Sequence, residues 1–147
     1  MARRSFYSSC DRVTDLSSYR SKENKLTTLN LTETQFEELI PKDGTVLVDF
    51  WAAWCGPCRS FAPVYETTSE KYPDLTFAKV DTEAEQSLAA AAGITSIPTL
   101  MIFRDGILLF SQPGALPGSA LEEIIGKVAE LDMDDVRKKI AEDRKKK

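Results

Sequence analysis

The stretch WAAWCGPCRSFAP, residues 51 to 63, carries two cysteines, Cys55 and Cys58, at the junction between two sequence patterns. Before it, TVLVDFWA (45 to 52) is almost continuously apolar, as is typical of a strand covered on both faces. After it, apolar side chains recur at helical spacing, and Gly56-Pro57 suits a first helical turn, where the N–H that proline lacks would have no partner. The stretch therefore predicts a strand that runs through a short loop into a helix.

This junction gives the two cysteines different environments. Cys55 comes at the helix N-terminus, where unpaired N–H groups and the helix macrodipole favour a thiolate. Cys58 lies three residues later over the same helical face, so the two sulfur atoms can meet in a disulfide. We therefore expect Cys55 to be the outer, attacking thiolate and Cys58 to resolve the mixed disulfide.

The chain contains no histidine, which excludes other uses of such a pair. A zinc site needs four ligands, and Cys10 is the only further cysteine. Haem attachment requires histidine after the second cysteine, where this chain has Arg59. A Cys–His protease is impossible without histidine. Thiol–disulfide exchange remains, and no metal is expected.

The bulk composition indicates one globular domain. The chain has 147 residues, 42% of them apolar, which is enough for a core without disulfide staples. Three cysteines do not suit a secreted disulfide framework, and no apolar run approaches the ~20 residues of a membrane span. The start, MARRSFYSSCDRVTD, lacks a secretory apolar stretch, and Asp11 and Asp15 weaken a transit-peptide interpretation. A cytoplasmic location, with no membrane contact, is the expectation.

Charge is distributed unevenly along the chain. Residues 1 to 25 carry six Lys/Arg against three Asp/Glu, and residues 137 to 147 carry seven against two. Because the whole chain has a net charge of −4, the body between these ends is at −12. An acidic body with basic ends does not suit a nucleic-acid reader. We expect solvated ends, although the ends could also fold back onto the body or touch an acidic partner.

The rest of the chain alternates strand and helix patterns. Strands are predicted at 26 to 31 and 75 to 81, a hairpin at 99 to 112 with its turn at Asp105-Gly106, and helices at 32 to 40 and 83 to 92. Thr32 and Gln35 form a capping box, and Gly93 is expected to end the second of these helices.

Two further helices are predicted at the end of the chain. Ser119 and Glu122 form a second capping box ahead of an apolar stripe that extends to Leu131, and another helix is expected from Asp134 onward. The order βαβαβαββα plus one helix predicts an α/β fold with a mixed sheet and helices on both faces. The predicted organisation is a disordered leader (1–25), one domain (26–132) and a C-terminal helical extension (133–147).

Three segments resemble the thioredoxin family of the small dithiol type: VDFWAAWCGPC, SIPTLMIF and PGAL. The resemblance covers roughly residues 26 to 131 and implies the thioredoxin fold. It also implies a protein-disulfide reductase that maintains cell redox balance without a bound cofactor. Its electrons would come from NADPH through a thioredoxin reductase, its substrates would be disulfide-containing proteins, and it would act as a monomer.

The resemblance also assigns roles to two charged residues in strands. From the residues alone, Asp49 is as compatible with a water-facing position as with burial. The resemblance implies that Asp49 lies buried below Cys58 and accepts its proton, through water. Lys79 matches a family lysine beside this acid, and the alternative is a strand-edge lysine that reaches out to water.

A docking surface for substrates is implied in the same way. Its members precede, separate or face the cysteines: Trp54, Gly56, Pro57, Ile97, Pro98 and Gly114. Most X–Pro bonds are trans, whereas the resemblance implies a cis Ile97-Pro98 bond, with the backbone of Ile97 bonding an extended substrate. Core packing is the alternative for Trp54, and a plain turn is the alternative for Gly114.

The pair Gly56-Pro57 between the cysteines favours a reductant. Isomerases and oxidases of this fold commonly have histidine there, and its absence suits a potential near roughly −270 mV rather than roughly −180 mV. Two other functions remain open: a binding module with incidental redox chemistry, and an oxidase or isomerase. Cys10 is expected to be a free thiol, and the leader could be an alternative start or a partner contact.

Overall fold

A computed structural model of the chain describes residues 27–146. The leader predicted at 1–25, with Cys10, lies outside these residues. The strands are β1 (Thr28–Asn30), β2 (Thr45–Trp51), β3 (Thr76–Asp81), β4 (Thr99–Arg104) and β5 (Ile107–Pro113). The helices are α2 (Glu33–Leu39), α3 (Gly56–Lys71), α4 (Gln86–Ala91), α5 (Gly118–Glu130) and α6 (Met133–Lys145).

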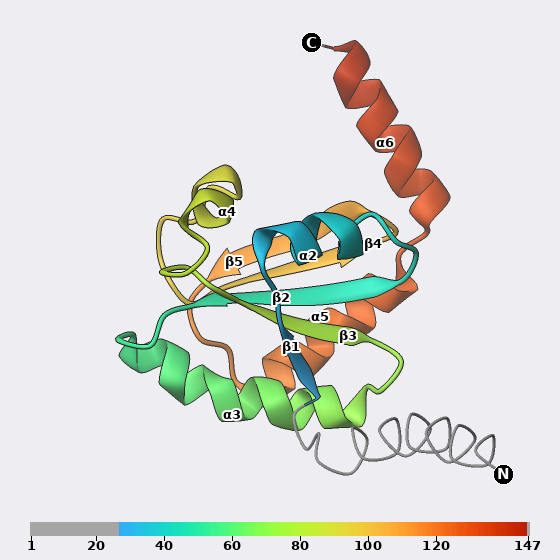
Figure 1. Cartoon of the computed structure of the whole chain (residues 1–147). Coiled ribbons are helices and arrows are strands. Elements are labelled where there is room, and N and C mark those ends of the chain that lie inside the picture. Colours follow the sequence, from blue (N-terminus) through green and yellow to red (C-terminus); the bar gives the residue numbers. More distant parts are fainter. Residues whose placement is uncertain (1–26, 147) are drawn as a thin grey trace, which may run out of the picture.

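The strands form one mixed sheet in the order β1-β3-β2-β4-β5. β1, β3 and β2 run parallel, while β4 and β5 form the antiparallel hairpin that the Asp105-Gly106 turn predicted. Helices α2 and α4 cover one face, α3 and α5 the other, and α6 extends away from both layers (Figure 1). The predicted α/β fold with an additional C-terminal helix is confirmed.

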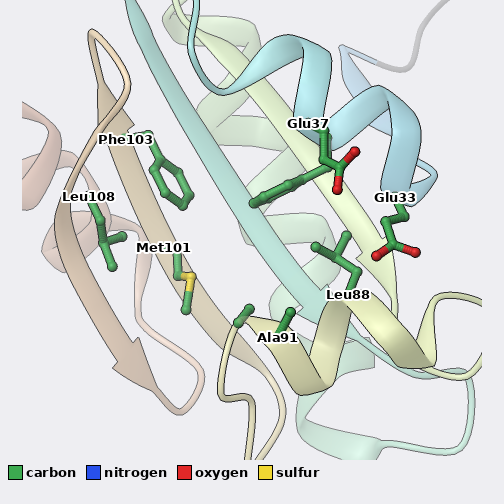
Figure 2. A pocket seen from close by; sticks show the side chains of 9 residues that line it. Glu33, Glu37, Leu88, Ala91, Met101, Phe103 and Leu108 are labelled. Atoms are coloured by element: carbon green, nitrogen blue, oxygen red, sulfur yellow. The ribbon is translucent and has the colours of Figure 1, made fainter.

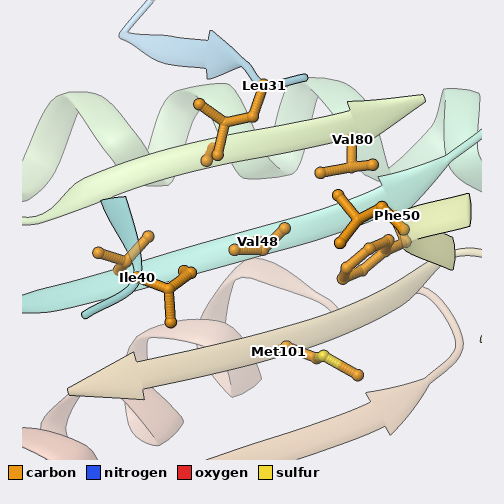
Figure 3. Close-up of a cluster of buried hydrophobic side chains, with 9 residues drawn as sticks. Leu31, Ile40, Val48, Phe50, Val80 and Met101 are labelled. Atoms are coloured by element: carbon orange, nitrogen blue, oxygen red, sulfur yellow. The ribbon is translucent and has the colours of Figure 1, made fainter. Parts of the chain in front are cut away.

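The central strand β2 is buried along its length because both faces are covered, as its apolar run predicted. Alternate residues point to opposite faces. Val48 and Phe50 join the core under α2 and α4, together with Val80 of β3 (Figure 3). Leu47 packs on the other face with Phe61 of α3. Asp49 comes between these apolar neighbours and is fully buried.

The second capping box was predicted wrongly. Pro117, in an extended conformation (φ −68°, ψ 155°), takes the N-cap of α5, and no side chain among residues 27–146 caps this helix. Ser119 is therefore already within the helix, and Glu122 instead forms an ion pair with Lys71 at 3.5 Å.

The end of α5 also differs from the prediction. Leu131, expected in the apolar stripe, is the C-cap and is 40% exposed. The guanidinium of Arg104 donates to the carbonyl oxygens of Val128 and Leu131, both at 2.9 Å. It therefore provides hydrogen-bond partners for carbonyl groups that have none within the helix. α6 then begins at Met133, capped by the Asp132 side chain.

Two other elements, a strand and a helix, are shorter than predicted. The edge strand β1 spans three residues, and Leu29 is 45% exposed while Thr28 is buried, so the alternation does not place every leucine in the core. α4 begins at Gln86 because a turn after β3 comes first, in which Asp81 accepts from the N–H of Glu83. No helix within residues 27–146 is long and apolar enough to cross a membrane.

Candidate functional site

The two cysteines lie where β2 passes into α3, as predicted. Cys55 is the N-cap of α3, and Pro57 occupies the first helical turn. Cys55 and Cys58 form a disulfide with their Cα atoms 5.2 Å apart. The Sγ atom of Cys55 also accepts a hydrogen bond from the backbone N–H of Cys58 at 3.2 Å. This donor belongs to the unpaired N–H groups of the helix start, which stabilise negative charge on a sulfur.

The segment before β4 faces the cysteine pair. The Ile97-Pro98 bond is cis, as the resemblance implied. The carbonyl oxygen of Ile97 lies 3.7 Å from the Sγ atom of Cys55, and Ile97 packs against the buried cluster of Ala52 and the two cysteines. The chain after β5 joins this segment, because the N–H of Gly114 donates to the carbonyl oxygen of Pro98 at 2.7 Å.

The surface around the disulfide is exposed although the cysteines are buried. Both cysteines have at most 4% of their surface exposed, whereas Trp54 is 67% exposed and so is not a core residue. Gly56, Pro57 and Gly114 are also exposed. Beside Trp54 lies a hollow of about 300 Å³. Its lining is mostly small and uncharged: Trp54, Thr82, Ala89, Ile94, Thr95, Ser96 and Ile97.

Glu83 belongs to this surface and was not predicted from the sequence. Its carboxylate accepts a hydrogen bond from the indole N–H of Trp54 at 2.7 Å. The turn after β3 positions Glu83, since Asp81 accepts from its backbone N–H at 2.9 Å. The only sequence signal was an acidic residue after a strand that ends near the cysteines.

Asp49 lies in the interior of the protein, on the central strand β2. It is fully buried, and within the described part of the chain neither carboxylate oxygen has a hydrogen-bond partner. Burial raises its pKa to about 7, because the charged form loses its hydration, while the charge of Lys79 acts in the opposite direction. A carboxyl group with such a pKa can take up or release a proton at neutral pH.

Lys79 is the register partner of Asp49 on the neighbouring strand β3. Its Nζ atom lies 5.0 Å from the centroid of the Trp51 ring, in a cation–π contact. The side chain is half-buried, so it is not a lysine that extends freely into water. The indole N–H of Trp51 is buried and has no partner among the described residues.

Tyr65 is a second buried titratable group, and it was not predicted as a site residue. Its hydroxyl donates to the carbonyl oxygen of Ala78 at 2.8 Å. Burial raises the pKa of Tyr65 well above its usual value, and the charge of Asp49 adds to the effect. Tyr65 therefore remains neutral at physiological pH, and in the sequence it was only one of the residues at helical spacing after the cysteines.

Comparisons with known proteins agree on one family. Residues 27–127 match the family model described as thioredoxin. A protein named putative thioredoxin 2 from Streptomyces coelicolor is 56% identical over 115 residues, which cover 78% of this chain and 86% of the relative. A thioredoxin from Porphyra purpurea is 44% identical over 99 residues, with 66% and 92% covered.

Solved structures agree as well. A mutant thioredoxin from Halobacterium salinarum superposes with a TM-score of 0.66 at 36% identity, over 71% of this chain and 93% of that one. The thioredoxin of Plasmodium falciparum superposes with a TM-score of 0.63, also at 36% identity, over 67% and 97%.

Proposed function

This chain belongs to the thioredoxin family, whose members are protein-disulfide oxidoreductases, and we propose that its Cys55 is the nucleophile and its Cys58 the resolving thiol. The observation that carries this assignment is the position of Cys55 at the N-cap of α3, where its sulfur accepts the N–H of Cys58. That N–H stabilises a thiolate on Cys55, whereas no backbone N–H of the described residues donates to the sulfur of Cys58.

The exchange proceeds in two displacements. The thiolate of Cys55 attacks one sulfur of a substrate disulfide, forms a mixed disulfide and releases the other substrate sulfur as a thiolate. Cys58 loses its proton and attacks the sulfur of Cys55, which forms the Cys55–Cys58 disulfide and releases the second substrate thiolate. Two electrons pass from the protein to its substrate.

The proton of Cys58 needs an acceptor, and we assign this role to Asp49, acting through an intervening water. Its burial on β2 and its pKa of about 7 support the assignment, because a general base works best with a pKa near the working pH. Lys79 tunes this base, since its positive charge favours the ionised carboxylate.

The substrate chain docks in an extended conformation around the disulfide. The carbonyl oxygen of Ile97, 3.7 Å from the Sγ atom of Cys55, is the backbone group placed to accept from it. The remaining contacts come from the same end of the sheet: Trp54, Gly56, Pro57, Pro98 and Gly114. A surface that uses backbone atoms and one large indole is suited to many protein substrates.

Thioredoxins need no bound cofactor and work with thioredoxin reductase and disulfide substrates in general. For this chain we propose the reducing direction, with electrons from NADPH through such a reductase and with the cytoplasm as the setting. The uncharged pair Gly56-Pro57 supports this direction, because it does not stabilise the reduced thiolate as histidine would. One chain supplies every group that we assign to the two displacements, so we propose that it acts as a monomer.

The deciding experiment is the redox equilibrium of the Cys55–Cys58 pair in defined dithiol buffers, measured by thiol alkylation and mass. A midpoint near roughly −270 mV is expected for a reductant, and one near roughly −180 mV would indicate an isomerase. The variant Cys10→Ser should have the same midpoint, since it removes the cysteine outside the pair.

Insulin reduction with the reductase and NADPH tests the assignment of each thiol. Cys55→Ser should abolish turnover, while Cys58→Ser should accumulate a mixed disulfide with the substrate. A Cys55→Ser, Cys58→Ser double variant that retained full activity in cells would contradict the redox function and favour a binding module.

A further inference from the structure

An apolar groove lies on the face of the sheet that α2 and α4 cover, with a volume of about 400 Å³. Met101 and Phe103 of β4 and Leu108 of β5 line it opposite Leu88 of α4 (Figure 2). Leu108 is 47% exposed, so the groove opens to the surface. None of the residues proposed above for the redox cycle lines this groove, so the proposed function does not account for it.

The floor of the groove suits an aromatic side chain. The ring of Phe36, from α2, meets the ring of Phe103 edge to face, with the ring centroids 5.8 Å apart. Met101 adds a thioether, which makes favourable contacts with aromatic rings and adapts to their shape. A further ring can pack against these neighbours in the offset or edge-to-face arrangements that aromatic pairs prefer.

The charge around the groove is negative. Glu33 and Glu37 of α2 line the groove, and no ion pair within residues 27–146 uses either of them (Figure 2). α4 and β5 carry no charged residue. Arg104 is the one basic residue of the four lining elements, and it donates to carbonyl oxygens at the end of α5. An occupant should therefore combine an aromatic ring with positive charge.

The leader contains this combination in RRSFY, at positions 3 to 7, where two arginines precede two aromatic residues. No acidic residue precedes Asp11. Tyr19, the other aromatic residue of the leader, has an acidic residue four positions to either side. The segment 3 to 7 therefore matches the groove in both respects, and Tyr19 does not.

The leader is long enough to reach the groove. The described chain begins at Thr27, and β1 leads directly into α2, which forms one side of the groove. Residues 8 to 26 can extend over about 60 Å, whereas a domain of about 100 residues has a radius of gyration of only about 13 Å. The covalent link also makes the contact intramolecular, at an effective concentration in the mM range, so that even a weak contact is populated.

We propose that the segment 3 to 7 docks in an extended conformation into the groove of its own chain. Phe6 packs on the aromatic floor. Alternate residues of an extended segment point to the same side, so Arg4 turns toward the groove with Phe6 and faces the two glutamates, while Tyr7 turns away. One ring and one ion pair make a small contact, so docking is reversible.

A nitroxide on Cys10 tests this in the full chain. In the oxidised protein the two active-site cysteines are paired, so a nitroxide maleimide reacts with Cys10, which is at most about 13 Å from Phe6 along the chain. The label increases the relaxation rate of nearby amide protons, with the ascorbate-reduced label as reference. We expect the largest increase at the groove, in Ala91 and Leu108, and little in α3 and α5 on the opposite face. No turnover is involved, so the result does not depend on the redox assignment.

The two aromatic residues provide a matched pair of variants. Phe6→Ser removes the ring that packs on the floor and should lower the increase at the groove about fivefold or more. Tyr7→Ser removes a ring of similar size that turns away from the groove and should leave the increase within about twofold. Equal loss in both variants would contradict the proposed docking.

Charge reversal tests the side of the groove formed by the glutamates. Arg3→Glu with Arg4→Glu, or Glu33→Lys with Glu37→Lys, should each lower the increase about threefold or more, because attraction becomes repulsion. The chain with all four substitutions again has opposite charges and should recover most of the increase. Failure of this rescue would remove the charge pairing from the proposal and so overturn it.

Two further samples complete the test. Glu66→Lys with Glu70→Lys reverses two charges, also four residues apart, on α3 at the opposite face and should leave the increase within about twofold. An isotope-labelled Cys10→Ser chain, mixed with nitroxide-bearing chains without the isotope, should show no increase at its groove, since the occupant belongs to the same chain. An increase confined to residues near Thr27, equal increases on both faces, or an increase at the groove in the mixture would overturn the proposal.

Discussion

Asp49 and Lys79 are opposite each other on the parallel strands β2 and β3, and the charge of Lys79 opposes the rise that burial causes in the pKa of Asp49. Burial is the larger of the two effects, and the pKa of Asp49 is about 7. The carboxyl group of Asp49 is therefore expected to change its charge near neutral pH.

The first prediction concerns the resolving step. Asp49→Asn should slow the attack of Cys58 on the mixed disulfide at pH 8 by on the order of 10²-fold, the low end of general-base catalysis. The difference should shrink below pH 7, where Asp49 is itself protonated. Rapid-mixing single turnovers measure this step, and equal rates for both proteins at pH 8 would remove Asp49 from the mechanism.

The second prediction concerns stability. The folded protein retains a proton on Asp49 up to a pH of about 7, whereas the unfolded chain loses it near the ordinary aspartate pKa of 3.8. Rising pH between these values therefore favours the unfolded state, by at most about 4 kcal/mol. Asp49→Asn should match the unmodified protein near pH 4 and become increasingly more stable toward pH 8, as measured by urea unfolding. A difference that does not depend on pH would contradict this.

The third prediction separates the charge of Lys79 from its shape. Lys79→Met removes the positive charge that favours the ionised carboxylate, so the pKa of Asp49 should rise further. The pH profile of the resolving step should then move to higher pH. Lys79→Arg retains the charge and should preserve the profile. Carbon NMR of the Asp49 carboxyl group reports the same titration without catalysis.

The fourth prediction concerns the hydrogen bond from Trp54 to Glu83. Glu83→Ala removes the acceptor that orients the exposed indole, a change of about 1 kcal/mol for one hydrogen bond. The KM for a protein disulfide should therefore rise about fivefold while the redox midpoint is unchanged. Glu83→Gln retains an acceptor and should recover most of the loss. An altered midpoint in Glu83→Ala would instead link this bond to the cysteines.

The fifth prediction concerns Gly114, which has φ +103° and where an added methyl group would meet no described residue within 4 Å apart from its two chain neighbours. Gly114→Ala should lower the free energy of unfolding by about 1–2 kcal/mol through backbone strain alone. Gly126, in α5, also faces open space but lacks a positive φ. Gly126→Ala should therefore stabilise the protein by about 0.5–1 kcal/mol. Thermal unfolding of the two variants compares them directly.

Sequence patterns predicted the elements whose signals were local and unopposed. The continuous apolar run of 45–52 predicted a buried strand, and the proline after Cys55 predicted the start of a helix. Both predictions were correct. The predicted start of α5 was wrong because two residues could serve as the N-cap. Pro117 takes this position in an extended conformation, two residues before Ser119, which the capping-box pattern favoured. A local motif does not reveal such competition.

Contacts between distant segments were harder to predict. The sequence left Asp49 undecided, because its burial depends on α3 packing over that face of β2. The bond between Trp54 and Glu83 joins residues 29 positions apart, through the turn that Asp81 organises. Its formation depends on how two loops meet at the end of the sheet, which no spacing rule describes.

The two cysteines are only three positions apart in sequence. Closing so short a ring removes little freedom from the unfolded chain, about 2 kcal/mol compared with nearly 5 for a loop of 100 residues. A small domain typically has about 5–15 kcal/mol of net stability. The protein can therefore open and close this bond in every catalytic cycle and remain folded in both states, because its architecture does not depend on the bond that it exchanges.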